Sequence, residues 1–311
     1  MASFGKKGGI PYMCEIVPRG RYILAAALIS AVTACSTAQR RSAETKLAEV
    51  LIPTEQENQL GLQVKQELEQ KQGIEYIEDG AVNDYVQRVA SRILEHAKKD
   101  RPDVRWTVKV INDPRQVNAF ATPGGYLYVY SGLILAADNT AEVAGVLGHE
   151  AGHVVARHSA RQMVNAVGLQ TLASVALGED PGTLAQLAAG LAGQGALLAH
   201  SRSDEIESDE LGARYSAAAG YDPHGIATFF GKLMKGEGKQ PGWARFLSTH
   251  PPSEERIERV NAFIAKHKLT GEGGTSGTEI ARVKDRIKAI PPPATARSGA
   301  EAEAGAGSGD R

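Results

Sequence analysis

The spacing of apolar residues predicts several helices and strands along the chain. Between Ala81 and Lys98, apolar residues recur with helical periodicity, which predicts an amphipathic helix. Residues 106–111 alternate between apolar and polar in the manner of a strand. A run rich in aromatic and β-branched residues, Tyr126–Tyr130, follows a Pro-Gly-Gly turn and predicts a second strand. The pattern therefore indicates a domain that contains both helices and strands.

Other stretches are typical of further helices. Residues 139–148 carry apolar side chains at the spacing of a buried helix, with Asp138 or Asn139 placed to cap its N-terminus. A charged helix is expected at Gln59–Lys71, and the acidic stretch that begins at Ser201 is expected to form another. We find no internal repeat, so these elements are expected to form a single domain.

Residues 163–199 are mostly small and apolar, apart from the break at Gly178–Gly182, and predict a helical hairpin. Each arm has about 16 residues, fewer than the roughly 20 that a helix needs to cross a bilayer. We therefore expect the hairpin to pack against the domain or to cover a cleft as a lid.

The candidate chemistry lies in the segment His149-Glu150-Ala151-Gly152-His153. On a helix, residues four apart share a face, so both imidazoles can reach one metal ion while Glu150 addresses a water on it. This H-E-x-x-H pattern is typical of zinc peptidases. A catalytic zinc site has three protein ligands and one open position, so a third ligand is expected elsewhere in the chain.

Two common positions for the third ligand do not fit this chain. In the pattern H-E-x-x-H-x-x-G-x-x-H, Ala156 stands in place of the glycine and Ser159 in place of the last histidine, with His158 one residue out of step. A glutamate about twenty residues downstream is also missing, since the nearest is Glu179 in a Gly-Glu-Asp-Pro turn. The third ligand is therefore expected farther along.

The acidic stretch Ser201–Ala213 supplies candidates, because Glu205 and Asp209 share one face of its helix. Spacing alone does not choose between Glu205 and Glu207. Together with the first motif, this stretch resembles metallopeptidase family 48, in which H-E-x-x-H is followed far downstream by E-x-x-x-D. The resemblance makes Glu205 the third ligand, beside His149 and His153. It makes Asp209 the acceptor that fixes the tautomer of a ligating imidazole.

The segment Leu247–Arg256 strengthens this resemblance through its Ser-Thr-His-Pro sequence, which implies that His250 lies near the metal. His250 either donates a hydrogen bond to the developing oxyanion or binds the metal in place of water and inhibits the enzyme. The resemblance is to the branch of periplasmic lipoproteins of the BepA and LoiP kind, without the tetratricopeptide repeats of some members. It implies a mostly helical, zincin-like α+β fold with a small β-sheet.

The segment Asn118–Tyr130 is similar to the edge strand that lines the active cleft in this family. The resemblance implies that an extended substrate pairs with the backbone there, near Asn118, Gly125, Tyr126 and Tyr128. Such pairing favours unfolded or extended segments over one cleavage sequence. An ordinary sheet strand without a substrate role is the alternative.

The N-terminus predicts the location of the protein. Basic residues precede the apolar run Tyr22–Ala31, which is typical of a signal peptide covering residues 1–34. The following Val-Thr-Ala-Cys resembles a bacterial lipobox, so Cys35 is expected to carry lipid. Ser36, rather than Asp, follows the cysteine and favours the outer membrane. We therefore expect a periplasmic protein anchored in the inner leaflet of that membrane.

Composition adds limits on function and domain organisation. The chain has 35 Lys and Arg and 36 Asp and Glu, which indicates neither a nucleic-acid partner nor a polybasic membrane patch. The only other cysteine, Cys14, lies in the signal peptide, so the mature chain has no disulfide. We expect the following organisation: a polar tether at 35–56, the peptidase domain at 57–269, a flexible linker and short helix at 270–290, and a disordered tail at 291–311.

The resulting hypothesis is a zinc metalloendopeptidase with one Zn²⁺ per chain and Glu150 as general base. The resemblance implies that it degrades misfolded or unassembled periplasmic and outer-membrane proteins, with the outer-membrane assembly machinery as a partner. One alternative is a chaperone-like assembly factor for outer-membrane proteins in which proteolysis is rare or blocked. Zinc-dependent hydrolysis of a non-peptide substrate is another.

Overall fold

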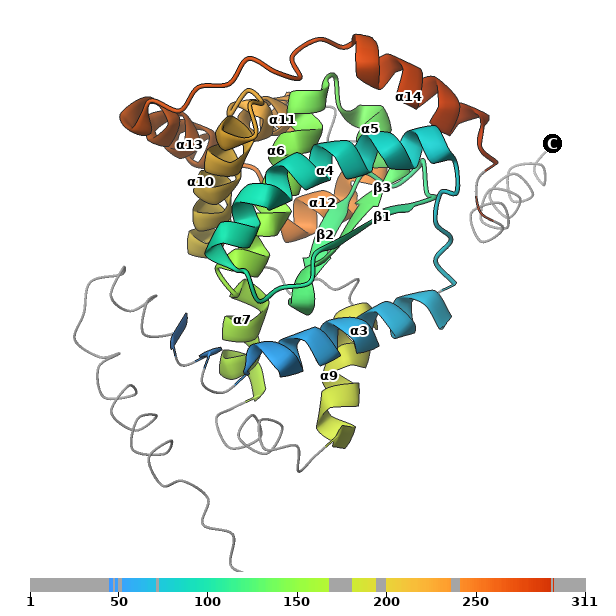
Figure 1. Ribbon diagram of the computed structural model, residues 1–311, viewed down its shortest axis with the longest axis vertical. Helices are drawn as coiled ribbons and strands as arrows, with labels where there is room; N and C mark the ends of the chain where they lie inside the picture. Colours follow the sequence, from blue (N-terminus) through green and yellow to red (C-terminus); the bar gives the residue numbers. More distant parts are fainter. Residues whose placement is uncertain are drawn as a thin grey trace, which may run out of the picture.

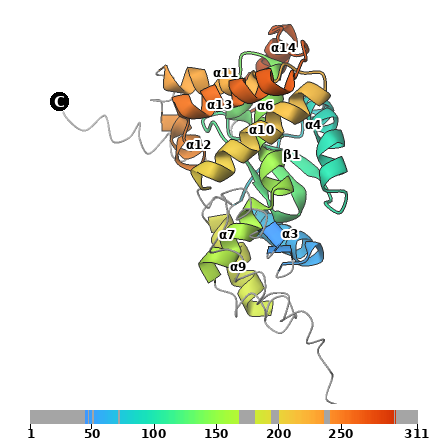
Figure 2. The ribbon, with the colours of Figure 1, turned by 90° about the vertical axis from the view of Figure 1, so that its left-hand side faces the viewer.

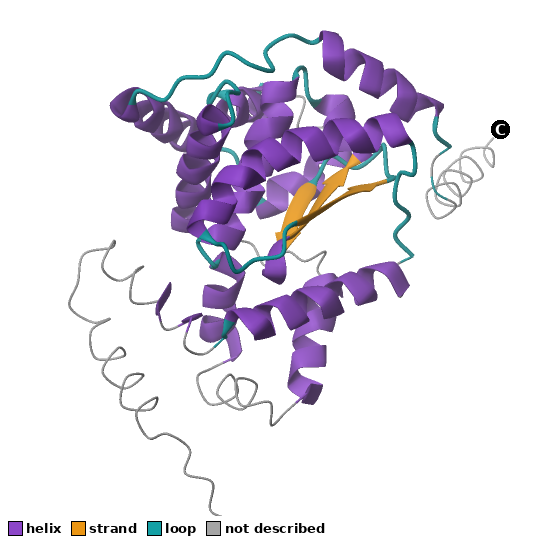
Figure 3. Cartoon of the chain, viewed as in Figure 1, coloured by secondary structure: helices purple, strands orange, loops and turns teal. Residues whose placement is uncertain are grey.

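The computed structural model describes residues 45–46, 48–49, 52–70, 73–167, 181–193, 200–235, 241–291 and 293. Within them, helices surround a small three-stranded sheet (Figures 1 and 3), which confirms the mostly helical α+β fold. The strands are β1 (Thr107–Ile111), β2 (Ala119–Thr122) and β3 (Tyr126–Tyr130). The helices are α3 (Thr54–Gln70), α4 (Gly80–Asp100), α5 (Ser131–Ala136), α6 (Thr140–Val155), α7 (His158–Val167), α9 (Pro181–Gly193), α10 (Arg202–Ala218), α11 (Gly225–Met234), α12 (Ala244–Thr249), α13 (Glu254–His267) and α14 (Thr278–Ala289), with short 3-10 turns η1 (Pro123–Gly125) and η3 (Pro241–Trp243).

Helix α6 lies at the centre of the molecule and is buried along nearly its whole length. The Asn139 side chain caps it by accepting a hydrogen bond from the backbone N–H of Glu142, as the sequence indicates. Apolar and small residues fill nearly all of the remaining positions of α6, so the helix has no solvent-facing side. It packs against α4, α10 and α11 (Figures 1 and 2), and these helices hold it in place.

The sheet has the order β1-β3-β2, with β1 parallel and β2 antiparallel to β3. Strand β3 is therefore central, and the prediction that its residues Tyr126 and Tyr128 lie on an edge strand is wrong. Both of its edges are occupied, since Tyr128 pairs with Lys109 on one side and with Phe120 on the other. The edge strand that packs against α6 is β2.

Both faces of the sheet are buried, and the side chains of β3 alternate between them. Leu127 and Val129 join the main core under α4 and α6. Tyr128 and Tyr130 join a second cluster, where the apolar face of α3 covers the other side of the sheet. The sequence predicts α3 to begin at Gln59, but it begins five residues earlier, and Ile52 is already buried. Part of the predicted tether thus belongs to the folded domain.

Helices α6 and α10 cross at glycines. A Cβ atom on Gly148 would lie 2.9 Å from the backbone oxygen of Gly212, and one on Gly212 would lie 2.7 Å from the backbone nitrogen of His149. Only glycine therefore permits this approach of the two backbones. The close crossing sets how near the acidic side chains of α10 come to the histidines of α6.

The predicted hairpin at 163–199 is described only in part, as the last residues of α7 and as α9. Ala188 of α9 lies in the same cluster as Met163 of α7 and the apolar side chains of α3, so α9 packs against the domain through α3. The rest of the hairpin lies outside the described residues. Among the described helices, none is both long and apolar enough to cross a membrane.

The segment 270–277, predicted as a flexible linker, is instead fixed to the domain by backbone hydrogen bonds. Gly273 donates to Gly220 over 3.0 Å, and Ala141 at the start of α6 donates to Gly274 over 2.9 Å. Composition favours a linker because it does not distinguish mobile glycines from glycines that permit close packing. Helix α14 then packs on α4 and α5 (Figure 1), so the folded domain extends beyond residue 269. The predicted signal peptide, Cys35 and residues 294–311 lie outside the described residues.

Candidate metal centre and active site

Two imidazoles project from adjacent turns of α6 toward one point. His149 and His153 are both buried, and their Nε2 atoms lie 3.0 Å apart. Their rings are nearly perpendicular, at 84°, so each nitrogen faces the point from its own direction. The i and i+4 spacing in the sequence therefore places the two side chains together as expected.

Helix α10 supplies a carboxylate to the same point. Ser201 and Asp204 form a capping box that starts the helix, and Glu205 follows in its first turn. Glu205 Oε2 lies 3.5 Å from His149 Nε2, and Glu205 Oε1 lies 3.4 Å from His153 Nε2. The Glu207 carboxylate instead contacts His158 and Arg161. The structure thus brings Glu205, and not Glu207, to the two histidines.

The C-terminal end of α12 adds a third imidazole. His250 is buried, and its Nδ1 lies 3.2 Å from His149 Nε2 and 3.2 Å from both oxygens of Glu205. Its Nε2 lies 3.5 Å from Glu150 Oε1. His250 therefore lies between the carboxylates of Glu205 and Glu150, close enough to join the donor group or to face a substrate.

A buried guanidinium from α13 balances the acidic side chains of α10. Arg256, 2% exposed, donates to both oxygens of Asp209 over 2.8 Å, and its Nη1 lies 2.9 Å from Glu205 Oε2. Asp209 Oδ1 also lies 2.8 Å from His149 Nδ1. Asp209 thus contacts the ring nitrogen of His149 that points away from the donor group. The sequence does not single out Arg256, because no local pattern distinguishes a buried arginine from one on an exposed helix face.

The donor set fits a divalent metal. The separations of 3.0, 3.4 and 3.5 Å between the donor atoms of His149, His153 and Glu205 are close to the edge of a tetrahedron around zinc, about 3.3 Å for bonds of 2.0–2.1 Å. Two imidazole nitrogens and a carboxylate oxygen that face one another repel unless a cation or a proton lies between them. The arrangement is therefore suited to a cation.

Electrostatics in the site follow from burial and from the close carboxylates. Burial opposes protonation of His149, but Asp209 and Glu205 outweigh it and raise the pKa of His149 to about 9. Burial, with His200 next to it, holds the pKa of His153 well below its usual value. Burial also raises the pKa of Glu150, which His250 and His149 partly oppose. A metal ion would take the place of the proton on His149.

Two further histidines, to which no sequence motif assigns a role, lie beside this group. His158, at the start of α7, is fully buried, and its Nδ1 lies 2.8 Å from Nδ1 of His153. The His200 ring stacks on His153 with ring centroids 3.9 Å apart. Their only signal in the sequence is that they flank the two ligand segments, which does not determine a spatial distance.

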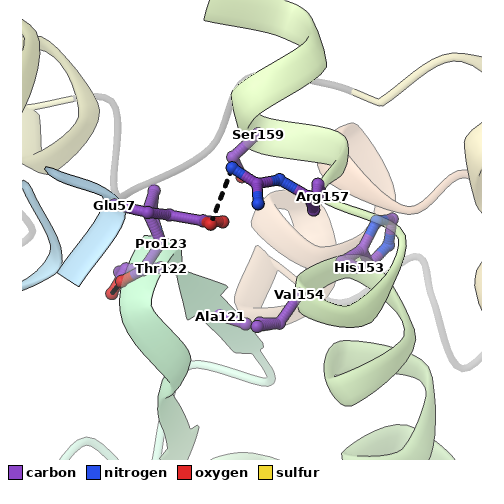
Figure 4. A pocket seen from close by; sticks show the side chains of 8 residues that line it. All are labelled: Glu57, Ala121, Thr122, Pro123, His153, Val154, Arg157 and Ser159. Atoms are coloured by element: carbon purple, nitrogen blue, oxygen red, sulfur yellow. Dashed lines mark hydrogen bonds and ion pairs between the residues drawn. The ribbon is translucent and has the colours of Figure 1, made fainter. Parts of the chain in front are cut away.

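A small pocket lies beside β2, and His153 is the one residue of the donor group that lines it. Figure 4 shows residues of β2 and η1 across from the last turn of α6, with the ion pair between Glu57 and Arg157, 3.2 Å, at one side. The lining residues are Glu57, Ala121, Thr122, Pro123, His153, Val154, Arg157 and Ser159. Of the predicted substrate residues, Asn118 is buried just before β2 and Gly125 lies in η1. The strand beside the pocket is therefore β2, in place of the predicted Tyr126–Tyr130.

Comparisons with known proteins agree with this geometry. The mitochondrial metalloendopeptidase OMA1 of Schizosaccharomyces pombe is 33% identical over 190 residues, which cover 60% of this chain and 55% of the relative. The putative beta-barrel assembly-enhancing protease of Vibrio cholerae is 34% identical over 193 residues, 58% of this chain and 39% of the relative. The beta-barrel assembly-enhancing protease of Escherichia coli is 29% identical over 191 residues, which cover 58% of this chain and 38% of the relative. The chain spans about half or less of the length of these curated relatives.

The model of peptidase family M48 matches residues 80–264, from the start of α4 to the last turns of α13. This match covers more than half of the chain and includes every residue of the buried donor group. The chain therefore belongs to peptidase family M48.

Proposed function

We propose that the protein is a zinc endopeptidase in which His149, His153 and Glu205 hold one Zn²⁺ per chain. The observation that carries this proposal is the convergence of their three donor atoms at tetrahedral spacing. Imidazole nitrogen and carboxylate oxygen are both zinc ligands, and a site with three protein ligands leaves one position for chemistry. Asp209, held by Arg256, keeps the proton of His149 on Nδ1 and leaves Nε2 for the metal.

The protein's own residues supply the proton transfers. When bound, zinc is a Lewis acid that polarises a peptide carbonyl and activates water. Glu150 accepts the proton of the attacking water and delivers it to the departing amine. Its pKa, raised by burial, brings it nearer to neutral pH, where a group serves best as both base and acid. The rate then decreases as the pH falls through that raised pKa, because a protonated Glu150 cannot accept.

Substrate binding is proposed along β2. This edge strand packs against α6, and the backbone of Ala121 contacts the Glu150 carboxylate. An extended peptide that adds to the edge of β2 opposite β3 would therefore place its backbone beside the donor group. Because backbone pairing is independent of side chains, we expect cleavage of unfolded segments with little sequence preference.

The cellular role that we propose is quality control in the bacterial envelope, by degradation of misfolded or unassembled outer-membrane proteins. It is supported by the lipobox-like sequence at Cys35 and by relatives named beta-barrel assembly-enhancing proteases. A lipid on Cys35 would hold the enzyme on the periplasmic side of the outer membrane, near newly arriving substrates and the assembly machinery.

Removal of the metal is expected to abolish cleavage. The full chain, treated with a chelator, should cleave an unfolded outer-membrane protein at least about 100-fold more slowly, and one equivalent of Zn²⁺ should restore the rate. Zinc should also stabilise the fold, by about 4 kcal/mol when free zinc exceeds Kd about 1,000-fold. The measurements are fragment formation, metal content and urea unfolding, with the folded form of the same substrate as the control. Unchanged cleavage by metal-free protein would exclude the proposed site.

A second candidate function is chaperone-like binding with proteolysis held back by His250. The position of His250 Nδ1, 3.2 Å from both His149 Nε2 and Glu205, favours it, because a fourth protein ligand would close the position that chemistry needs. If His250 is inhibitory, His250→Ala should raise the cleavage rate of the zinc-loaded protein. If His250 instead stabilises the oxyanion, the same change should lower kcat about 10²–10³-fold. Cleavage rate and zinc content of the two proteins distinguish these roles.

A further inference from the structure

His158 contacts the far side of the proposed ligand His153. The two Nδ1 atoms lie 2.8 Å apart, and both side chains are buried. If His153 binds a metal through Nε2, its Nδ1 carries a proton that needs an acceptor, because an unpaired buried donor is costly. His158 Nδ1 is the acceptor that lies at hydrogen-bond distance.

Contacts at the other ring nitrogen of His158, Nε2, determine that its Nδ1 can accept a hydrogen bond. Its Nε2 lies 3.2 Å from Glu207 Oε2 and 3.6 Å from Asp204 Oδ1. A carboxylate accepts hydrogen bonds, so His158 holds its proton on Nε2 and has a lone pair on Nδ1. Arg161, one turn along α7, fixes both carboxylates, at 3.3 Å from Glu207 and 2.5 Å from Asp204. The Ser208 hydroxyl also lies near this nitrogen, 3.3 Å from His158 Nδ1.

The two α6 histidines therefore have parallel supports. His149 Nδ1 contacts the carboxylate of Asp209, which Arg256 holds. His153 is likewise supported by a carboxylate that an arginine holds, but the imidazole of His158 lies between this ligand and the carboxylate. Glu207, the acidic residue of α10 that does not face the donor group, supplies this carboxylate.

We propose that His158 is a positioning residue for the metal centre: it accepts the Nδ1 proton of His153 and so directs the Nε2 lone pair of His153 at the metal. Glu207 and Arg161 hold His158 in the tautomer that can accept. The proposal rests on the zinc site proposed above. Because His158 begins α7, it also makes the orientation of His153 depend on the position of that helix.

The test compares two replacements of His158 in the full chain. His158→Leu keeps an apolar volume but has no acceptor, whereas the amide oxygen of His158→Asn lies near the position of the imidazole Nδ1. We expect His158→Leu to weaken zinc binding about 10–100-fold and to lower kcat with KM unchanged, since His158 contacts no substrate. His158→Asn should recover most of both. His224→Leu, at a histidine that is 47% exposed, is the matched control.

Zinc affinity is measured by competition with a coloured chelator, and ligand geometry by the visible spectrum of the Co²⁺-substituted protein, with thermal unfolding as the check on folding. Zinc affinity and Co²⁺ spectrum of His158→Leu equal to those of the parent would overturn the proposal. Equal losses in His158→Leu and His158→Asn would also overturn it, because packing rather than the acceptor would then matter. A parent protein that binds no zinc would instead refute the proposed function.

Discussion

Replacing Glu150 with glutamine is expected to lower kcat/KM for peptide cleavage by about 10²–10⁴-fold, the usual contribution of a general acid–base group. Glutamine has nearly the same shape, but it cannot take up the proton of the attacking water. The donor atoms of His149, His153 and Glu205 are unchanged, so zinc should remain bound. The measurements are cleavage of an unstructured peptide under zinc saturation and the zinc content of both proteins.

The matched control is Glu95→Gln, the same change on the exposed face of α4, which should leave both quantities unchanged. If Glu150→Gln cleaves as fast as the parent while it holds zinc, Glu150 is not the general base. If it loses zinc together with activity, the loss reports on the metal site, and the role assigned to Glu150 is unsupported.

Replacing Arg256 with methionine is expected to destabilise the fold by about 3–5 kcal/mol, the range for removal of one partner from a buried ion pair. Arg256 is 2% exposed and contacts two carboxylates, Asp209 and Glu205. Without the guanidinium these charges remain buried, with only the imidazoles of the site to balance them. Urea unfolding of the metal-free protein measures the effect without a contribution from zinc binding.

Arg259→Met, three residues along α13, is the control, because Arg259 is 57% exposed and should change stability by less than about 0.5 kcal/mol. Adding Asp209→Asn to Arg256→Met should cost less than the sum of the two single changes, since the charge left unpaired is then removed. A loss below 1 kcal/mol for Arg256→Met would mean that the carboxylates do not need this partner.

Helices with a strong local pattern could be predicted from the sequence. The helix expected at Ala81–Lys98 is α4, and its predicted apolar face is buried as expected. The helix around His149 also forms, with Asn139 as its cap. Periodicity and capping depend on residues within one or two turns, so they are visible in a single sequence. The position of α6 at the centre of the molecule depends on the same pattern, because its apolar residues leave no side for solvent.

Strand order could not be predicted in this way. The aromatic run Tyr126–Tyr130 was expected at the edge of the sheet, but β1 and β2 occupy its two sides. A strand buried on both faces has the same apolar composition whether or not its edges are paired. Pairing is decided by where β1 and β2 lie in space. The fixed position of residues 270–277 is not predictable for a similar reason, since glycine content does not show which backbone lies nearby.

The sequence by itself determined the two histidines on one helix face, the glutamate beside them, and the choice of metal peptidase chemistry, because i and i+4 spacing defines that geometry locally. Spacing left Glu205 and Glu207 open, and the resemblance to family 48 implied Glu205 and His250. Only the tertiary structure brings both residues to His149, His250 from 101 positions away, and places Arg256 and His158 against the ligand side chains. These contacts depend on how α6, α7, α10, α12 and α13 pack. The crossing of backbones at Gly148 and Gly212 fixes the distance between α6 and α10, and no local pattern encodes such a distance.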